Sequence, residues 1–156
     1  METASLSELK NELKTLTPKQ LQEICIRLVK HKKENKELLH YLLFESANQQ
    51  IFIENVKAEI AEQFKNLNKS SFYLAKKTVR KVLKTTNKYI KFSGVKETEI
   101  ELRIYFSIKL RKSGLRLSSS RVLLNLYRNQ IKRIQTVLAM LHEDLQYDYE
   151  EKISLL

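Results

Sequence analysis

Apolar residues recur every three or four positions along most of this chain, which is the spacing of amphipathic helices. Short polar breaks divide the pattern into about seven segments. They cover residues 6–16, 18–31, 38–44, 53–67, 71–92, 96–112 and 118–145. Because short connections make consecutive helices antiparallel neighbours, we expect an all-α protein without a sheet, built of stacked antiparallel helix hairpins in a bundle or a short superhelix.

Several segment ends have local signals of their own. Ser5 followed by Glu8 has the spacing of a capping box, in which each side chain accepts a hydrogen bond from the backbone N–H of the other residue. Thr17 and Gln20 repeat this spacing around a proline, which favours the first position of a helix. Gly94 can adopt the positive φ of a helix C-cap. These positions are therefore predicted helix boundaries.

Burial within each segment is predicted from the same spacing. The segment 96–112 is too densely apolar for a single stripe, so we expect it at the centre of the fold. The segment 38–44 is apolar on most sides, which predicts a helix surrounded by protein. The segment 18–31 is expected to bury Leu21, Ile24, Cys25 and Leu28. A buried thiol at position 25 would be inert.

Length and composition favour one folded domain that covers residues 1–156. The chain has two glycines and one proline, where average usage would give about 11 and about 8. This shortage of helix breakers favours a nearly all-helical chain. The acidic tail, residues 146–156, is expected to fray. A single cysteine and the lack of an apolar run of roughly 20 residues predict a reduced, cytoplasmic protein that does not insert into a membrane.

Positive charge is concentrated in the middle of the chain. Residues 65–116 contain 15 of the 29 lysines and arginines but only 3 of the 18 acidic residues. The net charge of +11 therefore originates in this stretch. An excess of this size creates a local field that attracts anions. We expect a basic helical face within 65–116 to bind nucleic acid or another polyanion.

The candidate contacts lie mainly on the segment 71–92, where lysines spaced by four and three positions share one helix face. The predicted polyanion-binding residues are Lys77, Lys81, Lys84, Lys88, Lys91, Arg80, Arg111, Lys112 and Arg116. The plainer interpretation is a solvated helix face, although like charges at this spacing repel one another. The nearby aromatic residues, such as Tyr73, Tyr89 and Phe92, are expected in the core more often than stacked on bases.

The segment 118–145 has apolar residues at alternating spacings of three and four, which form a seam for packing along another helix. The seam residues that would form an interface are Leu124, Tyr127, Ile131, Ile134, Leu138 and Leu141. Either this seam packs within the monomer, or it makes the chain a homodimer or a protein–protein scaffold. An exposed seam would be a large apolar patch that needs a partner.

Residues suited to catalysis or metal binding do not form a recognisable motif. The histidines, His31, His40 and His142, are not spaced to share a helix face with one another. Glu97 and Glu101 share a face, but carboxylates at the start of a helix also stabilise its dipole. We therefore expect no catalytic, metal or cofactor site and a non-enzymatic binding module. An enzyme assembled from scattered residues would instead need a deep polar pocket.

Four short stretches contain packing and capping motifs: LTPKQL at 16–21, YLLFE at 41–45, YLAKK at 73–77 and TNKYIK at 86–91. Together they resemble a family of small, uncharacterised bacterial all-helical proteins of unknown function. The resemblance implies a helical fold over most of the chain. It implies no activity, because none of these motifs belongs to an active site.

Overall fold

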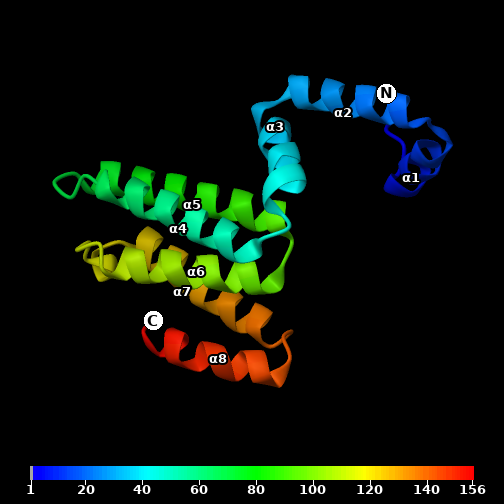
Figure 1. Cartoon of the computed structure of the whole chain (residues 1–156). Helices are drawn as coiled ribbons and strands as arrows, with labels where there is room; N and C mark the ends of the chain where they lie inside the picture. Colours follow the sequence, from blue (N-terminus) through cyan, green and yellow to red (C-terminus); the bar gives the residue numbers. More distant parts are fainter. Residues whose placement is uncertain (1) are drawn as a thin grey trace. The chain divides into compact units, whose positions relative to one another are not determined.

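The structure, a computed structural model, describes residues 2–156 and is all-helical over this range (Figure 1). Residues 2–156 form eight α-helices, one more than the seven segments expected from the sequence, together with a π-helical turn and a short 3₁₀ turn. The α-helices are α1 (Leu6–Thr15), α2 (Pro18–His31), α3 (Lys33–His40), α4 (Gln49–Lys65), α5 (Phe72–Ser93), α6 (Lys96–Arg111), α7 (Arg121–Leu138) and α8 (Glu143–Ser154). The π-helix spans Tyr41–Glu45 and the 3₁₀ turn spans Leu117–Ser119. No helix within residues 2–156 combines the length and the apolar character that a membrane crossing requires.

The predicted helix caps are present. The Ser5 hydroxyl accepts a hydrogen bond from the Glu8 N–H at 3.3 Å, and the Glu8 carboxylate accepts one from the Ser5 N–H at 2.7 Å. Thr17 and Gln20 form the same reciprocal pair at the start of α2, with distances of 3.3 and 2.9 Å. Gly94 ends α5 with a φ of +66°. These boundaries follow from local hydrogen bonding and backbone freedom, which is why the sequence predicts them.

The chain divides into two compact units, residues 1–44 and residues 45–156, where the sequence predicted one domain. In the larger unit, α6 contacts α4, α5 and α7, which confirms its predicted central position (Figure 1). Ile100 and Ile104 on α6 form a cluster with Ile134 of α7 and Tyr149 of α8. Elsewhere on α6, Phe106 is fully buried, and its ring centroid lies 5.7 Å from that of Phe64 on α4.

The C-terminal end of the structure differs from two expectations drawn from the sequence. The helix expected over 118–145 ends at Leu138, and a turn separates it from α8. The tail expected to fray forms α8 instead, where Tyr149 is buried and Ile153 packs against the central cluster. The apolar spacing continued through the break because α7 and α8 both contribute side chains to the same core.

The smaller unit exposes several of the apolar side chains that the sequence predicted to be buried, although Tyr41 is buried and Leu21 is half-buried. Helices α1, α2 and α3 contain no buried residue. Cys25 is exposed, Leu28 is 56% exposed, and Phe44, in the segment expected to be surrounded by protein, is 72% exposed. Amphipathic spacing predicts that a helix has an apolar face, but it does not supply a neighbour to cover that face.

Candidate polyanion-binding face

Helix α5 has one buried face and one strongly basic face. Ser71 caps the helix by accepting a hydrogen bond from the Leu74 N–H at 3.3 Å. The buried face consists of Ala75, Val79, Val82, Thr86, Ile90 and Phe92. On the other face, four of the five lysines in the predicted row are exposed. We call these four the exposed lysine row: Lys77, Lys81, Lys84 and Lys91.

Among residues 2–156, no carboxylate lies within ion-pair distance of the exposed lysine row. The lysines of the neighbouring helix α4, in contrast, have acidic partners. Lys57 lies 3.0 Å from both Glu54 and Glu101, and Lys65 lies 2.7 Å from Glu62. The basic excess of residues 65–116 therefore remains uncompensated along α5, which strengthens the local field there.

Lys88, the fifth lysine of the predicted row, has a different environment. It is half-buried, and its Nζ lies 4.5 Å from the ring centroid of Tyr89 and 5.9 Å from that of Phe92. Tyr89 in turn donates its hydroxyl proton to Glu59 at 2.7 Å. Lys88 is thus part of a packed aromatic group. The burial of Phe92 agrees with the expectation that these aromatic rings lie in the core.

Tyr73 does not follow the prediction for the aromatic residues, because it is 72% exposed. It precedes Lys77 by four positions, so both side chains lie on the same face of α5. An exposed ring in line with ammonium groups is a surface on which a nucleic-acid base can stack. The prediction failed because Tyr73 lies in the first turn of α5, at the edge of the unit.

The remaining predicted cations are distributed over a wider area. Arg80 is exposed on α5, and Lys112 and Arg116 are exposed after the end of α6. Arg111 donates hydrogen bonds to the backbone oxygens of the last two residues, at 3.0 Å for Leu155. Arg111 lies about 22 Å along α6 from its first residue. Only an extended ligand could therefore contact both ends of this basic region.

A basic depression lies at the C-terminal end of the exposed lysine row. Its volume is about 500 Å³, and its lining includes Lys91, Lys96, Glu99, Arg103 and Arg133. We call it the Arg133 pocket. Arg103 and Arg133 were not among the predicted polyanion-binding residues, because a pattern along one helix does not show which residue of α7 lies beside α6.

Glu99 organises the two arginines of the Arg133 pocket. Its Oε1 accepts hydrogen bonds from Nε of Arg103 and from Nε of Arg133, each at 2.8 Å, and its Oε2 accepts one from Nη2 of Arg133 at 3.2 Å. Arg103 also donates to the Gln130 side chain at 2.6 Å. Burial alone would raise the pKa of Glu99, but the hydrogen bonds from Arg133 and Arg103 outweigh burial and hold its pKa below the ordinary value.

Glu101, one of the two carboxylates considered for catalysis, has a structural environment. It lies 3.0 Å from Lys57 of α4 and also pairs with Lys152 of α8. Burial opposes its ionisation, but these two lysines lower its pKa below the ordinary value. Burial, together with the charges of Glu101 and Glu97, raises the pKa of Tyr149 to about 12. These contacts join three helices and hold the Glu101 carboxylate between two lysines.

The seam predicted as an interface packs inside the larger unit. Ile134 is fully buried, and Ile131, Leu138 and Leu141 pack against the cluster that contains it. Leu124 and Tyr127 are half-buried. None of the six seam residues is exposed, so the seam does not form an open apolar patch.

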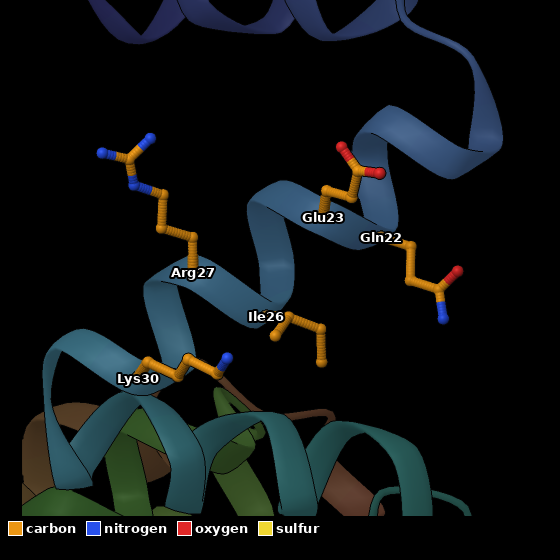
Figure 2. Close-up of a pocket in the computed structure, with 5 residues that line it drawn as sticks. All are labelled: Gln22, Glu23, Ile26, Arg27 and Lys30. Atoms are coloured by element: carbon orange, nitrogen blue, oxygen red, sulfur yellow. The ribbon is translucent and has the colours of Figure 1, made fainter.

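Two further depressions lie in the smaller unit. Figure 2 shows the first, of about 390 Å³, with Gln22, Glu23, Ile26, Arg27 and Lys30 all projecting from α2. These side chains spread outward from a single helix and do not converge on one point. The second, of about 300 Å³, is lined by residues of α2 and of the segment 35–42, most of them apolar. Neither depression has the convergent ionisable groups of a catalytic site.

The described part of the chain, residues 2–156, contains no group of three or more potential metal-ligating side chains placed to hold one ion. The comparisons with known proteins returned no matching family model, no matching curated protein and no matching solved structure.

Proposed function

We propose that this chain is a non-enzymatic module that binds nucleic acid through the basic face of α5. The observation that supports the proposal most directly is the exposed lysine row, whose four cations have no acidic partner within residues 2–156. Lysines neutralise backbone phosphates without reading base sequence. We therefore expect binding with little sequence preference, and strong dependence on salt.

The position of Tyr73 favours single strands over duplexes. Its exposed ring lies four residues before Lys77 on the same helix face. Bases of a single strand are free to stack on such a ring, whereas bases in a duplex are already stacked on each other. A strand that follows α5 would place phosphates beside the lysines and one base against Tyr73.

The test is a fluorescence anisotropy titration with single-stranded and duplex oligonucleotides at several salt concentrations. Four phosphate contacts on a single strand predict a slope of about −2.8 in a plot of log K against log salt concentration. Converting the exposed lysine row to glutamine should remove most of the affinity. Tyr73→Ala should weaken single-strand binding by roughly 1 to 3 kcal/mol and leave duplex binding nearly unchanged.

A matched control separates the α5 face from total charge. It converts four exposed lysines of the smaller unit to glutamine, namely Lys10, Lys14, Lys19 and Lys32. This variant has the same net charge as the row variant and should retain affinity. Equal losses in the two variants would show that net charge alone drives binding, and no binding at low salt would refute the proposal. Heparin competition measures how far the face accepts polyanions other than nucleic acid.

A second candidate function is protein–protein contact, favoured by the apolar side chains that the smaller unit exposes. Leu6, Leu28, Leu43 and Phe44 are each more than half exposed. The interface that we propose for a scaffold or homodimer therefore lies on residues 6–44 rather than on 118–145. Light scattering after size exclusion checks self-association, and a monomeric mass at high concentration would count against a homodimer.

The proposal also includes the arrangement of the helices, the location of the protein and its likeness to other proteins. We propose antiparallel helix hairpins for the larger unit. Its consecutive helices α4, α5 and α6 are joined by short connections, and each helix contacts the next one. We also retain a cytoplasmic location, a chain without enzymatic activity, and the resemblance to small bacterial helical proteins of unknown function. A nucleic-acid-binding module without a catalytic site is consistent with each of these.

A further inference from the structure

The Arg133 pocket differs from the exposed lysine row in shape and in the way its cations are held. The row lies along a helix surface, whereas the pocket is concave, with a volume of about 500 Å³. Its lining combines four cationic side chains with the carboxylate of Glu99, a formal excess of three positive charges. Such a concave cationic site suits a compact anion that can be surrounded, rather than a backbone that passes over it.

Glu99 neutralises one charge and fixes the position of two. Because its carboxylate accepts from both Arg103 and Arg133, their guanidinium groups are held beside each other. Not all of their donors are used in this way. Within residues 2–156, Nη1 of Arg133 and Nη2 of Arg103 have no protein acceptor. Guanidinium groups that are already oriented bind phosphate oxygens with a small loss of conformational freedom.

Two ammonium groups complete the cationic part of the lining. Lys91 and Lys96 are exposed, and neither has an ion-pair partner among the described residues. Lys91 is also the last member of the exposed lysine row, so the pocket and the row are continuous at the end of α5. A strand bound along α5 would therefore reach the pocket at this end.

We propose that the Arg133 pocket binds the terminal phosphate of a nucleic-acid strand, a phosphomonoester, whose backbone lies along the exposed lysine row. This inference rests on the proposed function and specifies its ligand. A terminal phosphate has up to two negative charges and three free oxygens, whereas an internal phosphodiester has one charge and two. The excess of three positive charges and the unused arginine donors suit the terminal group.

The test compares oligonucleotides of one sequence that end in a 5′-phosphate, in a 3′-phosphate, or in hydroxyls at both ends. Binding is measured by anisotropy competition with the full chain. We expect one of the two phosphorylated strands to bind roughly tenfold more tightly than the hydroxyl-ended strand. The arm that shows the preference identifies which end enters the pocket.

Single substitutions show whether the preference for a terminal phosphate depends on the Arg133 pocket. Arg133→Gln and Lys96→Gln should each reduce the preference to no more than about twofold, because they weaken binding of the preferred phosphorylated strand more than binding of the hydroxyl-ended strand. Lys132→Gln is the matched control, because Lys132 is exposed on the same helix and does not line the pocket. It should retain the preference. Thermal unfolding followed by circular dichroism shows whether each variant is folded.

The possible failures are distinguishable. Equal affinity for all three strands would refute terminal-phosphate binding and leave the proposed function standing. If no strand binds, the proposed function fails, and the pocket is then tested directly with pyrophosphate by NMR. Shifts confined to the signals of Lys91, Lys96, Arg103 and Arg133 would support a phosphate site on its own. No shifts at millimolar pyrophosphate would refute it.

Discussion

At the scale of single residues, Glu99 has a role in stability as well as in the Arg133 pocket. Its side chain is 12% exposed and connects Arg103 of α6 with Arg133 of α7. Both arginines stabilise the ionised carboxylate, which explains why its pKa lies below the ordinary value of 4.5 despite burial. This ionic link between α6 and α7 therefore stabilises the fold only when Glu99 is ionised, whereas the apolar contacts of Ile100 and Ile104 with Ile134 do not depend on its charge.

Replacing this carboxylate should destabilise the protein in a pH-dependent way. We expect Glu99→Gln to lower the free energy of unfolding by about 1 to 3 kcal/mol at neutral pH, because two charge-assisted contacts are lost. A folded-state pKa below the unfolded value means that the contribution is complete above pH 4.5 and is lost as the pH falls through the folded pKa. The wild-type and variant stabilities should therefore converge in acid.

Urea unfolding at a series of pH values measures this convergence. Glu150→Gln is a suitable control, because Glu150 is exposed and has no partner among the described residues. It should change stability by less than about 0.5 kcal/mol at every pH. A constant gap between wild type and Glu99→Gln from neutral pH to acid would contradict the ionic role of Glu99.

The exposed lysine row and the Arg133 pocket show which residue environments the sequence could predict. The row depends on spacing along one helix, so exposure of Lys77 and Lys81 could be predicted. By spacing, Lys88 belongs to the same face, yet its ammonium group lies over the rings of Tyr89 and Phe92. This position depends on how the side chains pack, which spacing along the helix does not show. Arg133 could not be placed, because its partner Glu99 is 34 residues away in the sequence.

At the scale of elements, helix boundaries with a local cap were predictable from the sequence, whereas the end of α7 was not. Four helices start at a residue whose hydroxyl accepts a hydrogen bond from a backbone N–H three positions later, namely Ser5, Thr17, Ser71 and Ser120. Such a cap uses residues within three positions, so sequence alone contains the signal. The residues that follow α7 include no glycine or proline, and Val137 and Leu138 at its end pack in the cluster that contains Tyr149 of α8. The break between α7 and α8 could therefore not be predicted from helix-breaking residues.

The position of α8 leads to a prediction about the C-terminal residues. A chain that ends at His142 should lose the burial of Tyr149 and Ile153 against the central cluster. It should also lose the ion pair between Glu101 and Lys152. Loss of one large buried side chain costs about 3 to 5 kcal/mol, so we expect at least this decrease in the free energy of unfolding.

Urea unfolding of the shortened chain, followed by circular dichroism, measures the effect. Tyr149→Ala in the full-length chain should reproduce most of the loss, since it removes the buried ring and keeps the rest of α8. Tyr147→Ala is the matched control, because Tyr147 lies on the same helix and is 74% exposed. A shortened chain as stable as the full one would mean that α8 frays in solution, as its acidic composition suggested.

At the scale of the whole molecule, burial is unevenly divided between the two units. The larger unit contains the fully buried side chains of α4, α5, α6 and α7. In the smaller unit, α1 to α3 bury no side chain completely. Burial of apolar surface is the main favourable term in folding, so the two units should differ strongly in their stability when separated.

We expect a fragment of residues 45–156 to unfold cooperatively, with a free energy of unfolding close to that of the main transition of the full chain. A peptide of residues 1–44 should show only marginal, non-cooperative helicity, because helices of 8 to 14 residues without a core are barely stable in water.

Native-state hydrogen exchange tests the same difference in stability on the intact chain. Amides of α6 should exchange most slowly and those of α1 to α3 fastest. Protection in α1 and α2 equal to that in α6 would show that the smaller unit folds with a core of its own or with a partner that covers its leucines.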